Sequence, residues 1–187
     1  MYRNLTIYNN LFNFVIIYVI VLYISPKRYH LYLPTIHIYP SYDEVKIVID
    51  KINRRNQQDV DFFKKTDLSI IYAFKDIVNI NTKILKEIIH SVNNIIYLFK
   101  YSINRARPYQ IHKELNILHS VTGNTPSFPA GHAFQAYYLA KILSNKYPEK
   151  KKKLDYIAKR CDDVRVTAGI HFPSDGQFSK YLVEHIL

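Results

Sequence analysis

The chain has 187 residues, 48% of them hydrophobic, which is enough for one domain with a packed core. Its 26 Lys and Arg residues outnumber 15 Asp and Glu residues, and the formal net charge of +11 favours an anionic partner: a phosphate ester, an acidic membrane surface or nucleic acid. The single cysteine, Cys161, excludes an intramolecular disulfide and is expected to be a small core residue, and no Cys/His cluster has the spacing of a zinc site.

The N-terminal segment is strongly apolar. Residues 11–24 are short for a spanning helix, which needs about 20 residues, and an extension to residues 5–24 reaches that length by including several polar side chains. The pattern fits an uncleaved membrane anchor, a cleaved export signal, or a core or interface helix. We expect residues 1–25 to be a hydrophobic anchor or signal-like segment and the proline-containing residues 26–41 to be a connector.

Residues 42–187 show helical periodicity and are expected to form one helical domain. No strand-like alternation is sustained, so the predicted fold is all-α. The predicted helices cover residues 42–54, 59–65, 68–78, 83–106, 131–147, 154–168 and 174–186. The segment 83–106 has a wide apolar stripe, which predicts a single long helix that is mostly buried.

The end of that long helix carries a pair of cations. Lys100 and Arg107 are seven residues apart, which is two helical turns, so both are expected on one helix face near an end set by Pro108. Two cations at a helix end suit an anion, although a solvated basic face has the same pattern. Arg105 would lie on a different face and is expected to be structural.

A proline–glycine turn precedes the next predicted helix. In the stretch Pro129-Ala130-Gly131-His132, backbone N–H groups at the helix start can bind an oxyanion. His132 would stand beside them as a proton donor. The alternative is a turn that leads into a helix and carries a partly exposed histidine.

An arginine, a histidine and an aspartate follow near the C-terminus. A neutral His171 imidazole can attack phosphorus if Asp175, four residues on, accepts a hydrogen bond from its other ring nitrogen. The planar guanidinium of Arg165 can donate several hydrogen bonds to phosphoryl oxygens. Taken alone, a His-x-x-x-Asp pair more often lies on a surface or in a core.

The three motifs occur in the order Lys-x6-Arg-Pro, Pro-x-Gly-His, Arg-x5-His-x3-Asp, and together they resemble the phosphatidic acid phosphatase type 2 (PAP2)/vanadium haloperoxidase superfamily over roughly residues 60–187. The amino-acid sequences of residues 125–133 and 166–175 resemble those of the soluble class A acid phosphatase branch. The resemblance implies an all-α bundle of about six helices of the PAP2/haloperoxidase type, with the motifs converging at one end and an additional N-terminal hydrophobic helix in this chain.

The resemblance also implies a metal-independent phosphomonoester hydrolase of broad acid phosphatase type. Its catalytic residues would be His171 as the nucleophile that forms a phosphohistidine, His132 as the proton donor and Asp175 as the partner of His171. The phosphate-binding positions would be Lys100, Arg107, Arg165, Gly131 and Ala130. No cofactor is expected, except vanadate if the chain were a haloperoxidase.

Two positions depart from the family pattern. Ala130 and Val164 stand where the family usually has serine. A lost hydroxyl at position 130 removes one hydrogen bond to a charged oxygen, worth roughly 1.5–3 kcal/mol, and predicts a slower enzyme. The alternatives are a lipid phosphate phosphatase at a membrane, anchored through residues 5–24, and a phosphate-binding relative without catalysis. Nucleic acid is not expected as a partner, and the oligomeric state is left open.

Overall fold

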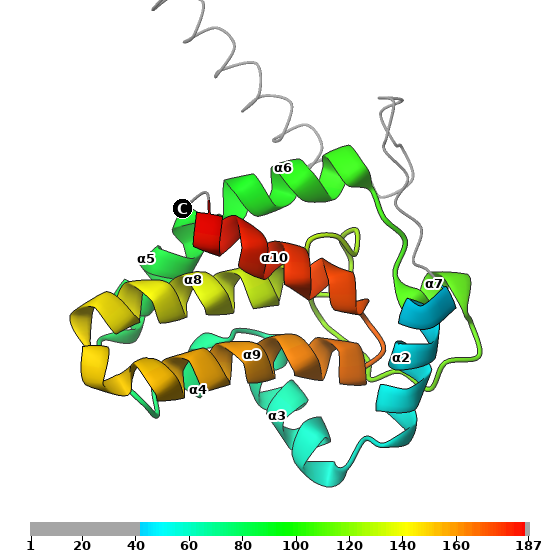
Figure 1. Ribbon diagram of the computed structural model, residues 1–187, viewed down its shortest axis with the longest axis horizontal. Coiled ribbons are helices and arrows are strands. Elements are labelled where there is room, and N and C mark those ends of the chain that lie inside the picture. The colour runs from blue at the N-terminus through cyan, green and yellow to red at the C-terminus, as the bar shows by residue number, and fades with distance from the viewer. Residues whose placement is uncertain (1–41, 186–187) are drawn as a thin grey trace, which may run out of the picture. The chain divides into compact units, whose positions relative to one another are not determined.

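The computed structural model describes residues 42–185, whose only regular elements are helices (Figure 1). The predicted all-α fold is therefore confirmed. Within residues 42–185, no helix is long and apolar enough to cross a membrane. The expected anchor at residues 1–25 and the connector at residues 26–41 lie outside the described residues.

The helices follow one another in this order: α2 (Tyr42–Asn53), α3 (Gln57–Asp67), α4 (Ile71–Phe74), α5 (Thr82–Ser91), α6 (Asn93–Ile103), α7 (Pro108–Ile111), α8 (Gly131–Lys146), the 3-10 turn η1 (Pro148–Lys150), α9 (Lys151–Thr167) and α10 (Pro173–His185).

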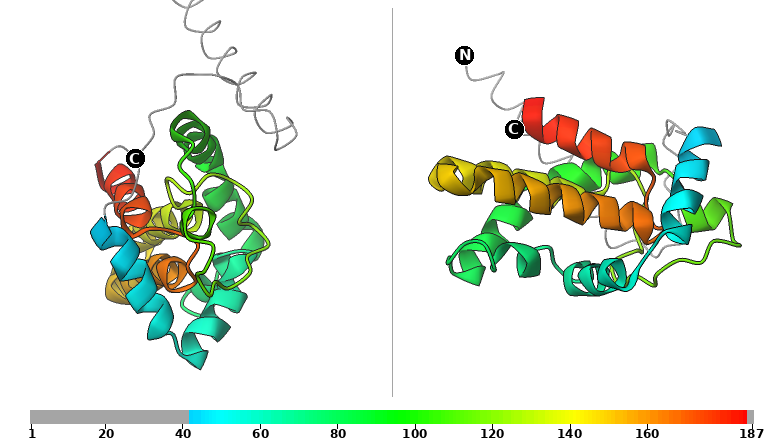
Figure 2. Two further views of the ribbon diagram at one scale, coloured as in Figure 1. Left: turned by 90° about the vertical axis from the view of Figure 1, so that its right-hand side faces the viewer. Right: turned by 60° about the horizontal axis from the view of Figure 1, so that its bottom comes forward.

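The helix pair α8 and α9 forms the centre of the domain, with α10 packed along α8 (Figures 1 and 2). Small buried residues such as Ala136, Ala140, Ala158 and Cys161 allow these helices to approach closely. The thiol of Cys161 is fully buried, as expected for a core residue, and burial raises its pKa to about 12. The centre of the domain is therefore an apolar layer between α8 and α9, which are consecutive in the chain, completed by buried residues of the earlier helices α4 and α5.

The predicted single helix over residues 83–106 is wrong, because α5 ends at Ser91 and α6 begins at Asn93. Val92 lies between them with φ −98° and ψ −1°, in a run of β-branched and short polar residues that have low helix propensity. The break separates two packing surfaces: Leu85 of α5 packs in the α8–α9 core, whereas Ile96 of α6 packs in a cluster with residues of α8 and α10. The helix predicted over residues 68–78 is also shorter in the structure, since α4 covers only Ile71–Phe74.

The first motif spans the break between α6 and α7 and does not lie on one helix face. Lys100 is in the last turn of α6, which ends at Asn104 in the left-handed conformation (φ 49°, ψ 44°). Arg107 is extended (φ −82°, ψ 158°) and precedes α7, where Pro108 occupies the first turn. The prediction that Lys100 and Arg107 share a helix face is therefore wrong, and Pro108 begins a helix instead of ending one.

Candidate active site

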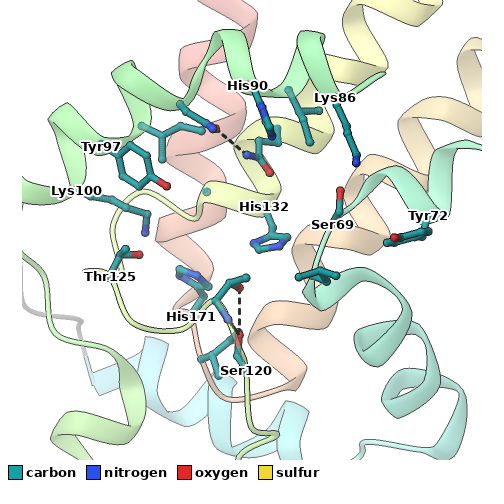
Figure 3. A pocket seen from close by; sticks show the side chains of 18 of the residues that line it. Ser69, Tyr72, Lys86, His90, Tyr97, Lys100, Ser120, Thr125, His132 and His171 are labelled. Atoms are coloured by element: carbon teal, nitrogen blue, oxygen red, sulfur yellow. Dashed lines mark hydrogen bonds between the residues drawn. The ribbon is translucent and has the colours of Figure 1, made fainter. Parts of the chain in front are cut away.

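A cavity of about 360 Å³ lies where the C-terminal end of α6, the start of α8 and the α9–α10 connection meet (Figure 3). Its lining includes three cationic side chains and three histidines, and none of the described residues that line it is Asp or Glu. These six residues are Lys86, Lys100, Arg107, His90, His132 and His171. A concave site with this charge pattern favours an anionic ligand.

Lys100 and Arg107 meet in this cavity although they come from different elements. Only 4% of Lys100 is exposed, and its ammonium donates to the carbonyl oxygen of Pro126. Arg107 is 3% exposed, and its Nε donates to the carbonyl oxygen of Thr125 at 2.8 Å while Nη1 donates to that of Ile170 at 2.9 Å. Burial lowers the pKa of both side chains, that of Lys100 well below its ordinary value. A bound anion would reverse that effect by stabilising the charged forms.

The tautomer of His171 follows from its two partners. Nη1 of Arg107 lies 3.2 Å from Nε2 of His171, and a guanidinium can only donate, so Nε2 is the unprotonated nitrogen. Nδ1 therefore carries the hydrogen, and it lies 3.0 Å from Oδ2 of Asp175. Burial, reinforced by the charge of Arg107, lowers the pKa of His171 to about 3. The imidazole is therefore neutral near pH 7, and the side chain of His171 lines the cavity (Figure 3).

Asp175 is fully buried behind His171 and accepts hydrogen bonds from several groups. Besides His171, these donors are the backbone N–H of Phe172 at 2.9 Å, Nη1 of Arg105 at 2.6 Å and the hydroxyl of Ser127. Burial alone would raise the pKa of Asp175, but the hydrogen bonds from His171 and Ser127 and the charge of Arg105 bring it below its usual value. Asp175 is therefore held as a carboxylate that fixes the ring of His171.

The start of α8 places His132 at the opposite wall of the cavity. Nε2 of His132 lies 2.9 Å from the backbone carbonyl oxygen of Asp67 and donates to it, so Nδ1 is the nitrogen left for a ligand. Burial and the nearby charge of Arg165 lower the pKa of His132 well below its ordinary value. Gly131 also lines the cavity, and as the first residue of α8 its N–H lacks an acceptor within the helix.

Arg165 and Ala130 do not line the cavity. The guanidinium of Arg165 is fully buried and donates to Oδ1 of Asp67 at 3.0 Å and to the backbone oxygen of Thr66 at 2.7 Å. Ala130 is also buried; it precedes α8 without a side-chain cap, and its N–H donates to the backbone oxygen of Asp175 at 3.1 Å. The phosphate-binding roles of Arg165 and of position 130 stay predictions.

Three residues of the site were missed or given a different role by the sequence reasoning. Asp67 was not among the predicted site residues, yet its carboxylate accepts a hydrogen bond from Arg165 and its backbone carbonyl accepts one from His132. Ser127 had no assigned role, although it lies two residues before the second motif, within residues 125–133. Arg105 was expected to be structural, and it contacts Asp175 directly. The sequence holds no local signal for Asp67, because its partner Arg165 is 98 residues away.

The chain belongs to the PAP2 superfamily, whose family model matches residues 80–182. Among solved structures, the chain is similar to a transmembrane PAP2 type phosphatidylglycerolphosphate phosphatase from Bacillus subtilis. The two share 19% sequence identity and a TM-score of 0.54, over 94% of this chain and 92% of that one. No curated protein matches the sequence. The predicted superfamily and the predicted enzyme class, a phosphatase, are confirmed by these matches.

Proposed function

We propose that the protein hydrolyses phosphomonoesters through a phosphohistidine at His171, without a metal ion. The observation that supports this most strongly is the orientation of His171: Asp175 holds Nδ1, and Nε2 lies at the cationic cavity beside Arg107. A carboxylate-held imidazole next to an anion-binding arginine is suited to nucleophilic attack on a bound phosphoryl group.

In the first step, Nη1 of Arg107 exchanges its hydrogen bond to Nε2 of His171 for one to a phosphoryl oxygen of the bound ester. The freed lone pair of Nε2 then forms a bond to phosphorus while the ester P–O bond breaks. Nδ1–H of protonated His132 gives its proton to the departing alkoxide, which leaves as the alcohol. Lys100, Arg107 and the N–H of Gly131 stabilise the charge on the phosphoryl oxygens in the transition state. These donors supply the positive charge that a metal ion provides in other phosphatases.

In the second step, water attacks the phosphohistidine. Neutral His132 accepts the proton of the water through Nδ1, the P–N bond breaks, and inorganic phosphate is released with both histidines returned to their starting states. Asp175 stays ionised throughout and stabilises the positive charge that His171 carries as the phosphohistidine.

For the substrate, we propose broad acid phosphatase activity on soluble esters, because the sequences around the second and third motifs resemble those of soluble class A acid phosphatases. A lipid phosphate is the second candidate, with the protein held at a membrane. It is favoured by exposed apolar side chains beside the cavity, namely Leu68 at 68%, Val121 at 60% and Tyr72 at 40% exposure. The fold match to a transmembrane phosphatidylglycerolphosphate phosphatase agrees with this second candidate.

The test is turnover of a small aryl phosphate by the full-length protein and by its His171→Ala and His171→Asn variants. Loss of the nucleophile should lower kcat by at least about a thousandfold. His185→Ala is the matched control, because His185 is exposed at the end of α10 and its replacement should leave kcat unchanged. Turnover that survives in the His171 variants within about tenfold would contradict the assignment. Phosphatidate in detergent micelles, assayed beside soluble esters, separates the two substrate candidates.

A further inference from the structure

We propose that Ser127 is a positioning residue for the nucleophile: its hydroxyl fixes the carboxylate of Asp175 and, through that carboxylate, the ring of His171. Ser127 does not line the cavity, so it would affect the reaction only through these two residues. The inference rests on the proposed function of the cavity and adds a residue on which the reaction depends without contact with the substrate.

The hydroxyl of Ser127 lies between the two groups that it would hold. Its oxygen is 3.3 Å from Nδ1 of His171, and it donates to Oδ2 of Asp175, the oxygen that lies 3.0 Å from the same Nδ1. Because Nδ1 carries the ring hydrogen, it cannot accept from the hydroxyl, so the single hydroxyl hydrogen goes to the carboxylate. The hydroxyl oxygen is then a second, more distant acceptor for Nδ1–H.

The carboxylate of Asp175 is saturated with hydrogen bonds only when Ser127 is included. Its four described donors are Nδ1 of His171, the backbone N–H of Phe172, Nη1 of Arg105 and the hydroxyl of Ser127. An ionised carboxylate offers about four acceptor positions. Asp175 and Ser127 are both fully buried, so bulk water does not replace a lost donor. Removal of the hydroxyl would therefore leave Asp175 more basic and less firmly held.

The backbone of Ser127 is attached to the first motif. Its N–H donates to the carbonyl oxygen of Arg105 at 2.8 Å, and its own carbonyl oxygen accepts from Nζ of Lys100 at 3.5 Å. Ser127 therefore connects the segment that carries a cation of the cavity to the segment that carries His171. The hydroxyl reaches Asp175 from a backbone that is itself fixed.

The experiment compares Ser127→Ala and Ser127→Cys with the full-length wild-type protein. Initial rates with an aryl phosphate give kcat and KM, and equilibrium binding of inorganic phosphate gives Kd. Nuclear magnetic resonance of isotope-labelled histidine follows Nδ1–H of His171. Ser144→Ala is the matched control, because Ser144 is a buried serine of α8 that does not line the cavity and has no hydrogen-bond partner for its hydroxyl among the described residues.

Ser127→Ala should lower kcat by about tenfold or more, while KM and the Kd of phosphate stay within about twofold. The Nδ1–H resonance should move downfield, because a more basic carboxylate draws the hydrogen closer. Ser127→Cys keeps a weak donor at the same place and should give intermediate values. In an Asp175→Asn background, the further loss caused by Ser127→Ala should shrink, since both changes disrupt one interaction. Ser144→Ala should change neither kcat nor the resonance.

Wild-type kcat together with an unmoved Nδ1–H resonance in Ser127→Ala would overturn the role of Ser127. Losses that are equally large with and without the carboxylate of Asp175 would also overturn it, since Ser127 would then act by another route. If Ser127→Ala does not fold, wild-type kcat and resonance in Ser127→Cys decide against the role. A wild-type protein without hydrolysis would instead overturn the proposed function, and the Nδ1–H resonance of the variants would still decide the role of Ser127.

Discussion

Replacement of Arg105 by methionine tests how the nucleophile is held. The side chain of Arg105 is 1% exposed, and Nη1 donates to Oδ1 of Asp175 at 2.6 Å and to the hydroxyl of Ser174 at 2.7 Å. Nη2 donates to Oε2 of Glu44 at 2.9 Å, and the guanidinium lies 4.6 Å from the ring centroid of Phe172. Arg105→Met keeps the length of the side chain but removes the charge and all three hydrogen bonds.

The expected cost follows mainly from Asp175, which is fully buried. Removal of one partner from a buried ion pair costs about 3–5 kcal/mol, because the other charge is left uncompensated. Glu44 is partly exposed, so water can replace its lost contact at a cost below about 1 kcal/mol. We therefore expect the free energy of unfolding to fall by about 4 kcal/mol. Since Arg105 acts on His171 through Asp175, kcat should also fall by about tenfold or more with little change in KM.

Urea unfolding followed by circular dichroism measures the first effect, and initial rates with an aryl phosphate measure the second. Arg54→Met is the control, because the Arg54–Asp50 pair is exposed at the C-terminal end of α2 and its loss should change stability by no more than about 0.5 kcal/mol. Arg105→Lys keeps a charge beside Asp175 and should recover part of both losses. Wild-type stability and kcat in Arg105→Met would refute the reasoning that Asp175 depends on this arginine.

Three further predictions concern the ends of α8 and α10 and the two histidines. Ala130 precedes α8 with φ −71° and ψ 102°, so Ala130→Ser should add a helix cap and raise the free energy of unfolding by about 1 kcal/mol. The added hydroxyl should also restore a hydrogen bond to a phosphoryl oxygen and increase kcat/KM by about tenfold. Unchanged values in urea unfolding and kinetics would contradict both effects. At Gly176, an added Cβ would lie 1.8 Å from Oδ1 of Asp162, so Gly176→Ala should cost about 1–3 kcal/mol, and a double-mutant cycle with Asp162→Ala should recover most of that cost unless the clash lies elsewhere. The pKa of His171 is about 3, so the nucleophile is neutral above pH 3, whereas the pKa of His132 is lowered, so the proton donor loses its proton as pH rises. The pH profile of kcat/KM should therefore peak on the acid side of neutrality. An alkaline optimum would contradict the roles given to the two histidines.

The all-α fold and most helices could be predicted because their apolar residues repeat at helical spacing. The break at Val92 could not, since the apolar stripe of residues 83–106 continues through it and only tertiary packing separates the surfaces of Leu85 and Ile96. The same stripe gives no signal for the end of α6 at Ile103, so Lys100 and Arg107 were both predicted on one helix face.

In the candidate site, the motif residues Lys100, Arg107, His132 and His171 meet at one cavity, which their order along the chain favoured. The partners that hold these groups could not be predicted, because they depend on contacts between distant segments. Asp67 lies next to Arg165 only after α3 packs against α9. Periodicity identifies which face of a helix is buried, but it does not identify the carboxylate or carbonyl that meets a buried cation.

The most direct test of the account is to trap the covalent intermediate. The full-length protein is mixed with a radiolabelled phosphate ester, quenched in alkaline denaturant, and digested to locate the label. Catalysis through a phosphohistidine predicts stoichiometric label on His171 that survives base and is lost in acid, as a phosphoramidate bond requires, and no label in His171→Ala. Rapid turnover with no label on His171, or label on a different residue, would contradict it.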